Sequence, residues 1–326
     1  MLIVTSHGDC TLLAPVTDVR SLRKRTDFEV KAFRNEVEMF SQLREVFEEY
    51  KALNVGVEKN TLSALTYERY CANVLPPPFK LSDVSNIISG LRQVKSEEEV
   101  ECIRKASHIA DQSMKIGLEA VKVGVTEIAV AGELEHSMRQ YGAERLGIPT
   151  YVCSGPRSGL AHGRASSRRM KNGDVVQISI SPGYHGYYSD LCRMIVLGSP
   201  TTELKNAYSA YVKALEKSIR EAKPGSTAGK VEWIFAESLK NSGYRGRFIV
   251  PLIHGIGLDH AEAPIPPGHT GLQGPDPKLL ENMTLGVGNC GLYFPKYGVR
   301  VEDTILVTEK GGVKLTNFPR TLTNST

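Results

Sequence analysis

Three side chains with metal-ligand chemistry fall on predicted strands in the second part of this 326-residue chain. They are Asp190, His254 and Glu302, and a fourth candidate, His162, lies in a predicted loop. Carboxylates and imidazoles that come from separate strands can converge on one open metal site. The alternative is that these groups are solvated or hydrogen-bonded at strand ends, as most polar side chains are.

The elements that must position these residues form two similar series, each with two helices followed by strands. In the first series we predict helices over 96–122 and 126–141 and strands over 174–181 and 187–196; in the second, helices over 203–222 and 231–241 and strands over 254–258, 284–289 and 299–308. The turns 122–126 and 223–227 share the pattern Lys-x-Gly-x-Thr at equivalent points. This repetition predicts an internal duplication.

A smaller α/β unit precedes this duplicated part. Two short apolar runs, 1–5 and 10–15, flank a turn and predict a hairpin. A charged connector, Lys95-Ser-Glu-Glu-Glu99, then leads into the first long helix with a capping-box spacing. We therefore predict two domains, covering residues 1–93 and 94–326.

The composition excludes several classes of protein. Hydrophobic residues make up 41% and charged residues 23% of the chain, which is typical of a globular protein. The longest stretch without a charged residue, Val175–Ser189, is shorter than the roughly 20 residues of a membrane helix. The net charge of +4 and a short basic stretch at 164–171 do not indicate a nucleic-acid partner. We predict no nucleic-acid or membrane partner.

The cysteines and the N-terminal residues bear on the cellular compartment in which the protein is found. Six scattered cysteines form no CxxC pair, so we predict free thiols in a reducing environment. The first residues lack a basic segment followed by a cleavage site, so no secretory signal is visible. The predicted location is cytoplasmic.

Four segments, in order, resemble the pita-bread family of creatinase, aminopeptidase P and prolidase. They are Ser154-Gly-Pro-Arg-Ser with His162-Gly-Arg; Gly173-Asp-Val-Val with Ser189-Asp-Leu-Cys-Arg193; His254-Gly-Ile-Gly-Leu with Glu262-Ala-Pro; and Gly291-Leu-Tyr with Gly298-Val-Arg-Val-Glu-Asp303. The resemblance covers about residues 94–310. It implies a shortened α/β N-terminal domain, an α+β pita-bread C-terminal domain with pseudo-twofold halves, and a homodimer.

The resemblance also implies a weakened metal site. Peptidases of this family hold two ions with two Asp, one His and two Glu, and three of these ligands match Asp190, His254 and Glu302. The other two fall on Ser179 and, with one inserted residue, Asn289. Because two negative charges are lost, we expect at most one divalent ion (Mn²⁺, Co²⁺ or Zn²⁺) or none. A vestigial hydrogen-bonded cluster is the alternative.

Further roles are implied for three residues. His162 matches the catalytic histidine of creatinase, so we predict a general acid/base, against a loop histidine bonded to the backbone. Glu262 and Arg300 are predicted to bind substrate, against a solvated acid and a structural salt bridge. Creatinase binds its substrate with Glu at the positions of Cys192 and Asn289, so hydrolysis of creatine itself is not expected.

Three neighbouring positions depart from the family or offer other chemistry. The family's second histidine falls on Ala261, and we expect the adjacent His260 not to replace it unless a bulge intervenes, because neighbouring strand residues face opposite sides. Cys192 shares the face of Asp190, as a thiol nucleophile or as a small hydrophobe. Trp233 is predicted to lie in the core.

Two functions follow. The first is a divergent Xaa-Pro dipeptidase/creatinase-family hydrolase, not an ordinary two-metal peptidase, that acts on a C–N bond of a small peptide or amide-like substrate. The alternative is a catalytically inactive pita-bread homologue that serves as a peptide- or protein-binding module or as an inactive partner subunit.

Overall fold

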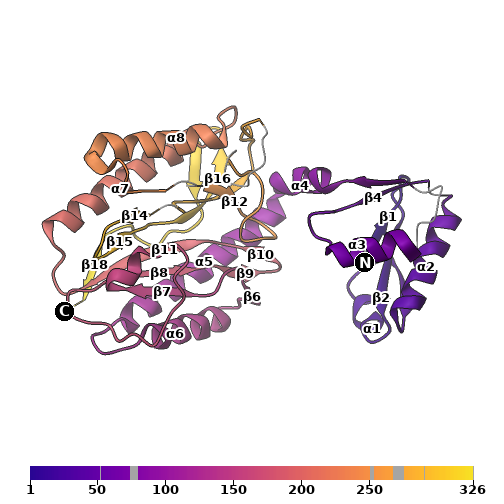
Figure 1. The fold of residues 1–326 in the computed structure, drawn as a ribbon, viewed down its shortest axis with the longest axis horizontal. Coiled ribbons are helices and arrows are strands. Elements are labelled where there is room, and N and C mark those ends of the chain that lie inside the picture. Colours follow the sequence, from indigo (N-terminus) through magenta and orange to yellow (C-terminus); the bar gives the residue numbers. More distant parts are fainter. Residues whose placement is uncertain (52, 74–79, 250–252, 267–274, 290, 326) are drawn as a thin grey trace. The chain divides into compact units, whose positions relative to one another are not determined.

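The chain divides into two compact units, Met1–Ile88 and Ser89–Thr326 (Figure 1). The computed structural model describes residues 1–51, 53–73, 80–249, 253–266, 275–289 and 291–325. The domain boundary predicted after residue 93 falls at the end of helix α4, Ser85–Gln93. The proline run at 76–78 lies outside the described residues.

The first unit contains two small sheets and their helices. Its elements are β1 (Leu2–Val4), β2 (Cys10–Pro15), α1 (Val19–Leu22), β3 (Glu29–Phe33), α2 (Glu36–Glu49), β4 (Asn54–Val57), α3 (Ala64–Asn73) and β5 (Lys80–Asp83). The predicted hairpin is confirmed, because β1 pairs antiparallel with β2, which then pairs parallel with β3. Leu13, Leu43 and Phe47 form one of its buried clusters, and Ala14, Val19 and Val30 form the other.

The second unit carries the duplicated architecture. Its elements are α5 (Glu97–Ala120), α6 (Glu127–Gln140), β6 (Arg145–Leu146), β7 (Tyr151–Ser154), the 3₁₀ turn Gly155–Gly159, β8 (Val175–Ile180), β9 (Pro182–Tyr184), β10 (Tyr187–Tyr188), β11 (Leu191–Leu197), α7 (Thr202–Glu221), α8 (Ala228–Leu239), the π-helical turn Lys240–Tyr244, β12 (Ile253–Gly255), β13 (Thr284–Val287), β14 (Leu292–Tyr293), β15 (Gly298–Val299), β16 (Asp303–Thr308), β17 (Gly311–Lys314) and β18 (Thr323–Ser325). The two main sheets have the strand orders β18-β11-β8-β7 and β12-β13-β16-β17.

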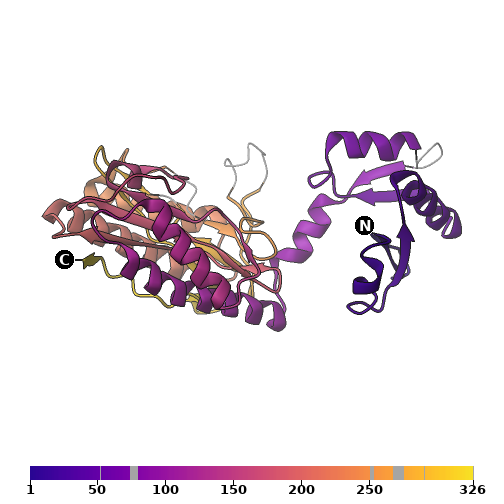
Figure 2. The same ribbon diagram turned by 90° about the horizontal axis from the view of Figure 1, so that it is seen from below.

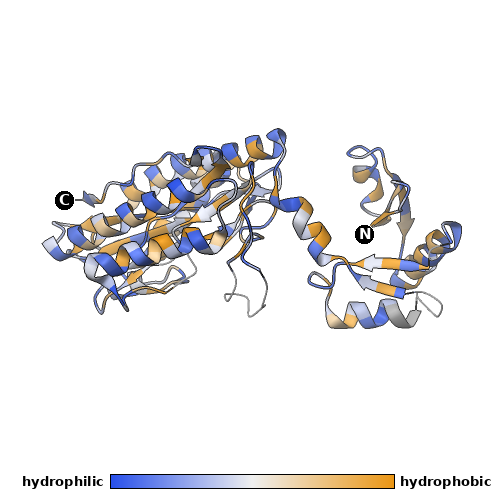
Figure 3. Cartoon of the chain, turned by 90° about the horizontal axis from the view of Figure 1, so that it is seen from above, coloured by the Kyte–Doolittle hydropathy of each residue, from blue (hydrophilic) through white to orange (hydrophobic). Residues whose placement is uncertain are grey.

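The two helix pairs pack on the sheets of the second unit (Figures 2 and 3), and buried apolar side chains form one cluster in each half. Met114 of α5 and Leu134 of α6 share a buried cluster with Ile178 of β8. Phe235 of α8 shares the other large cluster with Ile305 of β16. The sheet faces turned away from the helices are therefore free to carry polar side chains.

The two Lys-x-Gly-x-Thr turns are held in the same way, which supports the predicted duplication. Thr126 and Thr227 each cap the following helix by accepting a backbone N–H three residues on. Gly124 and Gly225 each adopt a positive φ, +86° and +84°. Their N–H groups donate to the carbonyls of Met170 and Leu279 respectively.

Two predicted strands are interrupted where candidate site residues occur. The strand predicted over 187–196 divides into β10 and β11, and Asp190 lies between them. The strand predicted over 299–308 divides into β15 and β16, and Glu302 lies in the gap. An isolated antiparallel bridge joins Cys192 to Glu302 and so links the two sheets at these interruptions.

Trp233 does not belong to the core, contrary to the prediction. Its side chain is 61% exposed on α8, whose buried face carries Val231, Phe235 and Leu239 instead. In the described part of the chain Cys10, Cys102, Cys153 and Cys192 are free thiols. No described helix is both long and apolar enough to cross a membrane.

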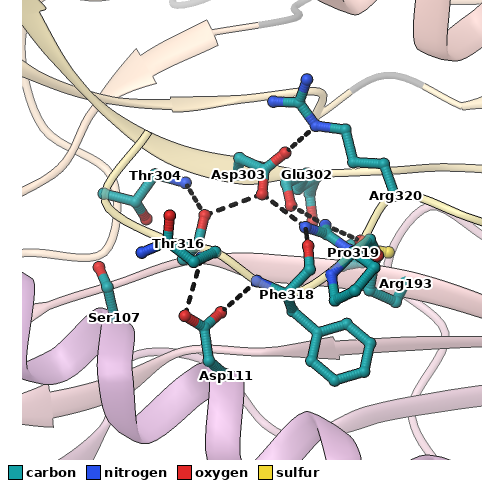
Figure 4. Close-up of polar contacts among 12 residues, drawn as sticks. Ser107, Asp111, Arg193, Glu302, Asp303, Thr304, Thr316, Phe318, Pro319 and Arg320 are labelled. Atoms are coloured by element: carbon teal, nitrogen blue, oxygen red, sulfur yellow. Dashed lines mark hydrogen bonds and ion pairs between the residues drawn. The ribbon is translucent and has the colours of Figure 1, made fainter. Parts of the chain in front are cut away.

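A buried arginine joins the two halves of the second unit (Figure 4). Arg193 of β11 is 1% exposed, and its guanidinium donates to Asp303 of β16 at 2.6 Å. Its other N–H groups donate to the carbonyls of Cys192, Glu302, Phe318 and Pro319.

The carboxylate of Asp303 is equally engaged. It accepts from Arg320 at 2.6 Å and from the Thr316 hydroxyl at 2.8 Å. Burial raises the pKa of Asp303, but Arg193 and Arg320 outweigh this effect, and the net pKa shift is downward. With these charge-assisted partners the Asp303 carboxylate stays ionised. Together with the four backbone carbonyls it satisfies all the N–H donors of Arg193.

We expect the substitution Asp303→Asn to destabilise the second unit by about 3–5 kcal/mol, because it leaves a buried guanidinium without its counter-charge. In thermal unfolding this corresponds to a Tm lower by roughly 6–20 °C. The matched control is Glu309→Gln, an exposed acid in the turn after β16, for which we expect an unchanged Tm. An unchanged Tm in Asp303→Asn would contradict this role of the ion pair.

Candidate active site

A pocket of about 210 Å³ opens in the second unit where its two sheets carry their polar faces. It is lined by Ile148, Tyr151, His162, Ser179, Asp190, His254, His260, Ala261, Asn289 and Arg300. The sequence-predicted residues His162, Asp190, His254 and Arg300 thus come together, whereas Glu262 is absent from this lining.

Asp190 is fixed by its backbone, and its carboxylate is left available. Its N–H donates to the Thr304 hydroxyl at 2.7 Å, and its carbonyl accepts from the same hydroxyl at 3.0 Å. The side chain is buried, yet Oδ1 has no hydrogen-bond partner. A buried carboxylate oxygen without a partner indicates a missing cation or donor.

His254 approaches this carboxylate from strand β12. Its Nδ1 lies 2.9 Å from the carbonyl of Gly255, which can only accept, so Nδ1 carries a proton. Its Nε2 lies 3.7 Å from Asp190 Oδ2 and has no hydrogen-bond partner. Gly286, opposite on β13, makes room for the ring, because a Cβ there would lie 2.7 Å from His254 Cε1.

His260 faces the pocket, contrary to the expectation from strand alternation. Strand β12 ends at Gly255, and the following residues form bends, with Gly257 N–H donating to the Asp259 carbonyl. Alternation therefore does not apply to this segment. The Nε2 of His260 lies 4.0 Å from Asp190 Oδ2.

Glu302 lies beside the pocket with both carboxylate oxygens engaged. Oε1 accepts from Arg300 at 2.5 Å, and Oε2 accepts from the Ser179 hydroxyl at 3.1 Å. Arg300 also donates to Asn289 Oδ1 at 2.8 Å and to the Ala161 carbonyl at 2.7 Å. The guanidinium thus forms the structural ion pair considered for it and also lines the pocket, and its binding of substrate stays a prediction.

The electrostatics favour a positive charge beside Asp190. Burial raises the pKa of the Asp190 carboxyl, but His260 and His254 outweigh this effect, and the net pKa shift is downward. Burial lowers the pKa of His254, and the contact with Asp190 reverses that shift. Burial raises the pKa of Glu302, and Arg300 opposes the rise. Either a proton on His254 or a bound cation can compensate the negative charge of Asp190.

Comparison with known proteins identifies the family. Residues 101–309 match metallopeptidase family M24, and residues 1–94 match the creatinase/prolidase N-terminal domain. The chain belongs to metallopeptidase family M24. The resemblance predicted from the sequence motifs is confirmed.

Relatives agree over nearly the whole chain. A curated Xaa-Pro dipeptidase of Pyrococcus furiosus is 34% identical over 321 residues, which cover 98% of this chain and 88% of the relative. The structure of an Xaa-Pro dipeptidase from Bacillus anthracis superposes with a TM-score of 0.91 at 28% identity, covering 99% of this chain and 88% of that one. The prolidase of Pyrococcus furiosus superposes with a TM-score of 0.87 at 32% identity, covering 98% and 90%. The predicted α/β plus pita-bread fold is thereby confirmed.

The M24 family implies metal, and the residues present fit one ion. Asp190 Oδ1 and His254 Nε2 are buried donor atoms without partners, as a metal site requires. A second ion does not fit the described residues, because Ser179 and Asn289 are neutral and Glu302 is paired with Arg300.

Two other interpretations concern the cysteine and the loop histidine. The Cys192 thiol is fully buried, and burial together with Glu302 raises its pKa, so it lacks the thiolate character of a nucleophile. His162 lies at the exposed side of the pocket, with its ring centroid 6.3 Å from that of Tyr151. Its loop is held by the bond from Arg300 to the Ala161 carbonyl.

Glu262 forms ion pairs with Lys95 of the connector and with Arg92 just before it. Its Oε1 accepts from Lys95 at 2.7 Å, and its Oε2 accepts from Arg92 at 2.5 Å. The Lys95 side chain is 1% exposed and the Glu262 side chain 8%. Glu262 therefore anchors the segment that carries His260, a role that neither sequence interpretation included.

The sequence did not reveal that Ile148 and Tyr151 line the pocket. It also did not reveal that Arg92 and Lys95 form ion pairs with Glu262. From the sequence, the connector at Lys95 is predicted to lead into the first long helix, and it resembles the interdomain linker of the family. A buried lysine next to a capping box gives no local signal, because its partner is far along the chain.

We expect Glu262→Gln to destabilise the second unit by about 3–5 kcal/mol, because it leaves the buried Lys95 ammonium unpaired. The matched control is Asp259→Asn, which removes the exposed acid on Arg92 and which we expect to cost less than about 1 kcal/mol. Thermal unfolding measures both. A raised KM for substrate with an unchanged Tm would instead assign Glu262 to substrate binding.

Proposed function

We propose that this protein is a hydrolase that cleaves a C–N bond of a small substrate, such as an Xaa-Pro dipeptide or an amide-like metabolite, with one divalent ion. The observation that carries the proposal is the pair of unpartnered buried atoms, Asp190 Oδ1 and His254 Nε2, beside the pocket of an M24 protein. Relatives named Xaa-Pro dipeptidases support the reaction class.

The pocket volume supports a small substrate. Its volume is about 210 Å³. Pockets for drug-sized ligands begin at about 300 Å³. A dipeptide whose remaining part extends into solvent suits this volume better than a long peptide held entirely inside.

Each residue of the pocket would have a separate role in hydrolysis. Asp190 and His254 would hold the ion, which when bound supplies Lewis-acid polarisation of the scissile carbonyl. The fixed guanidinium of Arg300, already oriented by Glu302 and Asn289, would stabilise negative charge that develops on the substrate. His162, at the exposed side, would transfer a proton to the departing nitrogen.

The geometry and the comparisons give no observation that favours the alternative of an inactive binding module. The homodimer and the cytoplasmic location implied earlier stay predictions.

We expect the protein loaded with Co²⁺ or Zn²⁺ to hydrolyse Xaa-Pro dipeptides, and His162→Ala to lower kcat by about 10²–10⁴-fold through loss of proton transfer. Steady-state kinetics with Ala-Pro and Leu-Pro measure this. The matched control is His136→Ala, an exposed histidine on α6, which should retain full activity. Absence of turnover with dipeptides and small amides would contradict the proposal and favour the inactive homologue.

We expect the triple substitution Ser179→Asp, Asn289→Glu and Arg300→Gln to raise the metal content from one ion per chain to two, because it supplies two further carboxylates and releases Glu302 from its guanidinium. The control Ser179→Asn, Asn289→Gln and Arg300→Gln changes size similarly without adding carboxylates and should still bind one ion. Elemental analysis after removal of free metal measures the stoichiometry. Two ions in the unmodified protein would contradict the one-ion assignment.

A further inference from the structure

We propose that His260 is the third protein ligand of this ion, so that Asp190, His254 and His260 form a single imidazole-rich site selective for Zn²⁺ or Co²⁺ over Mn²⁺. This inference rests on the proposed function for the presence of an ion at Asp190. It adds a ligand that lies one position before the family's substrate histidine, whose place Ala261 occupies.

The distances between the three donors suit one ion. His254 Nε2 and His260 Nε2 lie 3.7 and 4.0 Å from Asp190 Oδ2. Each of the three residues offers one ligand atom, and these ligand atoms all lie within 4.8 Å of one another. Two ligands of one tetrahedral Zn²⁺ lie about 3.3–3.4 Å apart, since each bond is about 2.0–2.1 Å long. The two imidazole nitrogens must therefore move about 0.3–0.7 Å closer to Asp190 Oδ2, and the most widely separated donors at most about 1.5 Å closer together, to complete the set.

Both imidazoles are oriented by contacts at their other nitrogen. His254 Nδ1 donates to the Gly255 carbonyl, and His260 Nδ1 lies 3.0 Å from the Ser181 hydroxyl. When that hydroxyl accepts, both Nε2 atoms present lone pairs toward Asp190. Such outer contacts, which fix the tautomer and the ring, are typical of histidines that bind metals.

Among the residues that the structure describes, Asp190, His254 and His260 form the one group of three metal-ligating side chains at this pocket. Glu302 is held by Arg300 and Ser179, and the Asn289 oxygen accepts from Arg300. The permanently charged guanidinium also disfavours a second cation on this side of the pocket.

The donor types decide the metal. Two imidazoles and one carboxylate match the His₂-carboxylate set of catalytic zinc sites, which keep one position open for substrate or water. Mn²⁺ and Mg²⁺ prefer sites rich in oxygen and bind such sets more weakly than Co²⁺ or Zn²⁺. The loss of carboxylates at Ser179 and Asn289, together with the gain of the His260 imidazole, moves the site in this direction.

The test is a Co²⁺ titration of metal-free protein, followed by visible absorption, with Zn²⁺ displacement to obtain the affinity. For the wild type we expect one Co²⁺ per chain, displaced by Zn²⁺ and only poorly by Mn²⁺. In His260→Ala we expect the Zn²⁺ affinity to fall by about 100-fold or more, because loss of a ligand exceeds the 10–100-fold cost of losing an outer contact. The Co²⁺ spectrum should change as well.

Two further variants keep the test decisive. His260→Cys supplies another zinc ligand at the same place and should recover most of the affinity, which separates ligand loss from misfolding. His162→Ala removes a pocket imidazole outside the cluster and should leave the Zn²⁺ affinity unchanged.

The two proposals fail in different ways. One ion bound equally well by the wild type and by His260→Ala, with the same Co²⁺ spectrum, would overturn the role of His260 and leave the one-ion hydrolase intact. No ion in the wild type, or two ions, would overturn the metal assignment of the proposed function itself.

Discussion

The guanidinium of Arg193 spans the junction between the two duplicated halves and donates to one carboxylate and four backbone carbonyls. A buried charge of this kind is stable only when all its donors are satisfied, so it demands one arrangement of the surrounding strands. The carbonyl of Glu302 is among its acceptors, at 2.6 Å. The ion pair with Asp303 thus holds together the backbone on which the pocket depends.

From this junction the pocket is organised by a second arginine. Arg300 neutralises Glu302, orients Asn289 and supports the loop of His162 through the Ala161 carbonyl. The side of the pocket nearest Arg300 is therefore already compensated in charge. The same pocket also holds an anionic Asp190 with two imidazoles. We propose that this group attracts a cation, whereas the Arg300 guanidinium itself offers a positive charge to the substrate.

The elements were largely predictable, and the partners of the site residues were not. Helix caps and periodicity are local signals, so α5, α6 and α7 lie close to where the sequence places them. His260 was misjudged because a strand pattern was extended past Gly255, where bends replace the strand. Trp233 was misjudged because an aromatic residue on a helix does not reveal which face the helix buries.

By itself the sequence determined the family and the two similar series of helices and strands, since these depend on residue types, order and local periodicity, and it predicted neutral residues, Ser179 and Asn289, at two ligand positions of the family. The tertiary structure decided which atoms remain available for chemistry. Glu262 meets Lys95 across 167 residues, and Glu302 meets Ser179 across 123. Contacts so distant along the chain leave no local pattern, because they arise only when separate strands and loops are packed together.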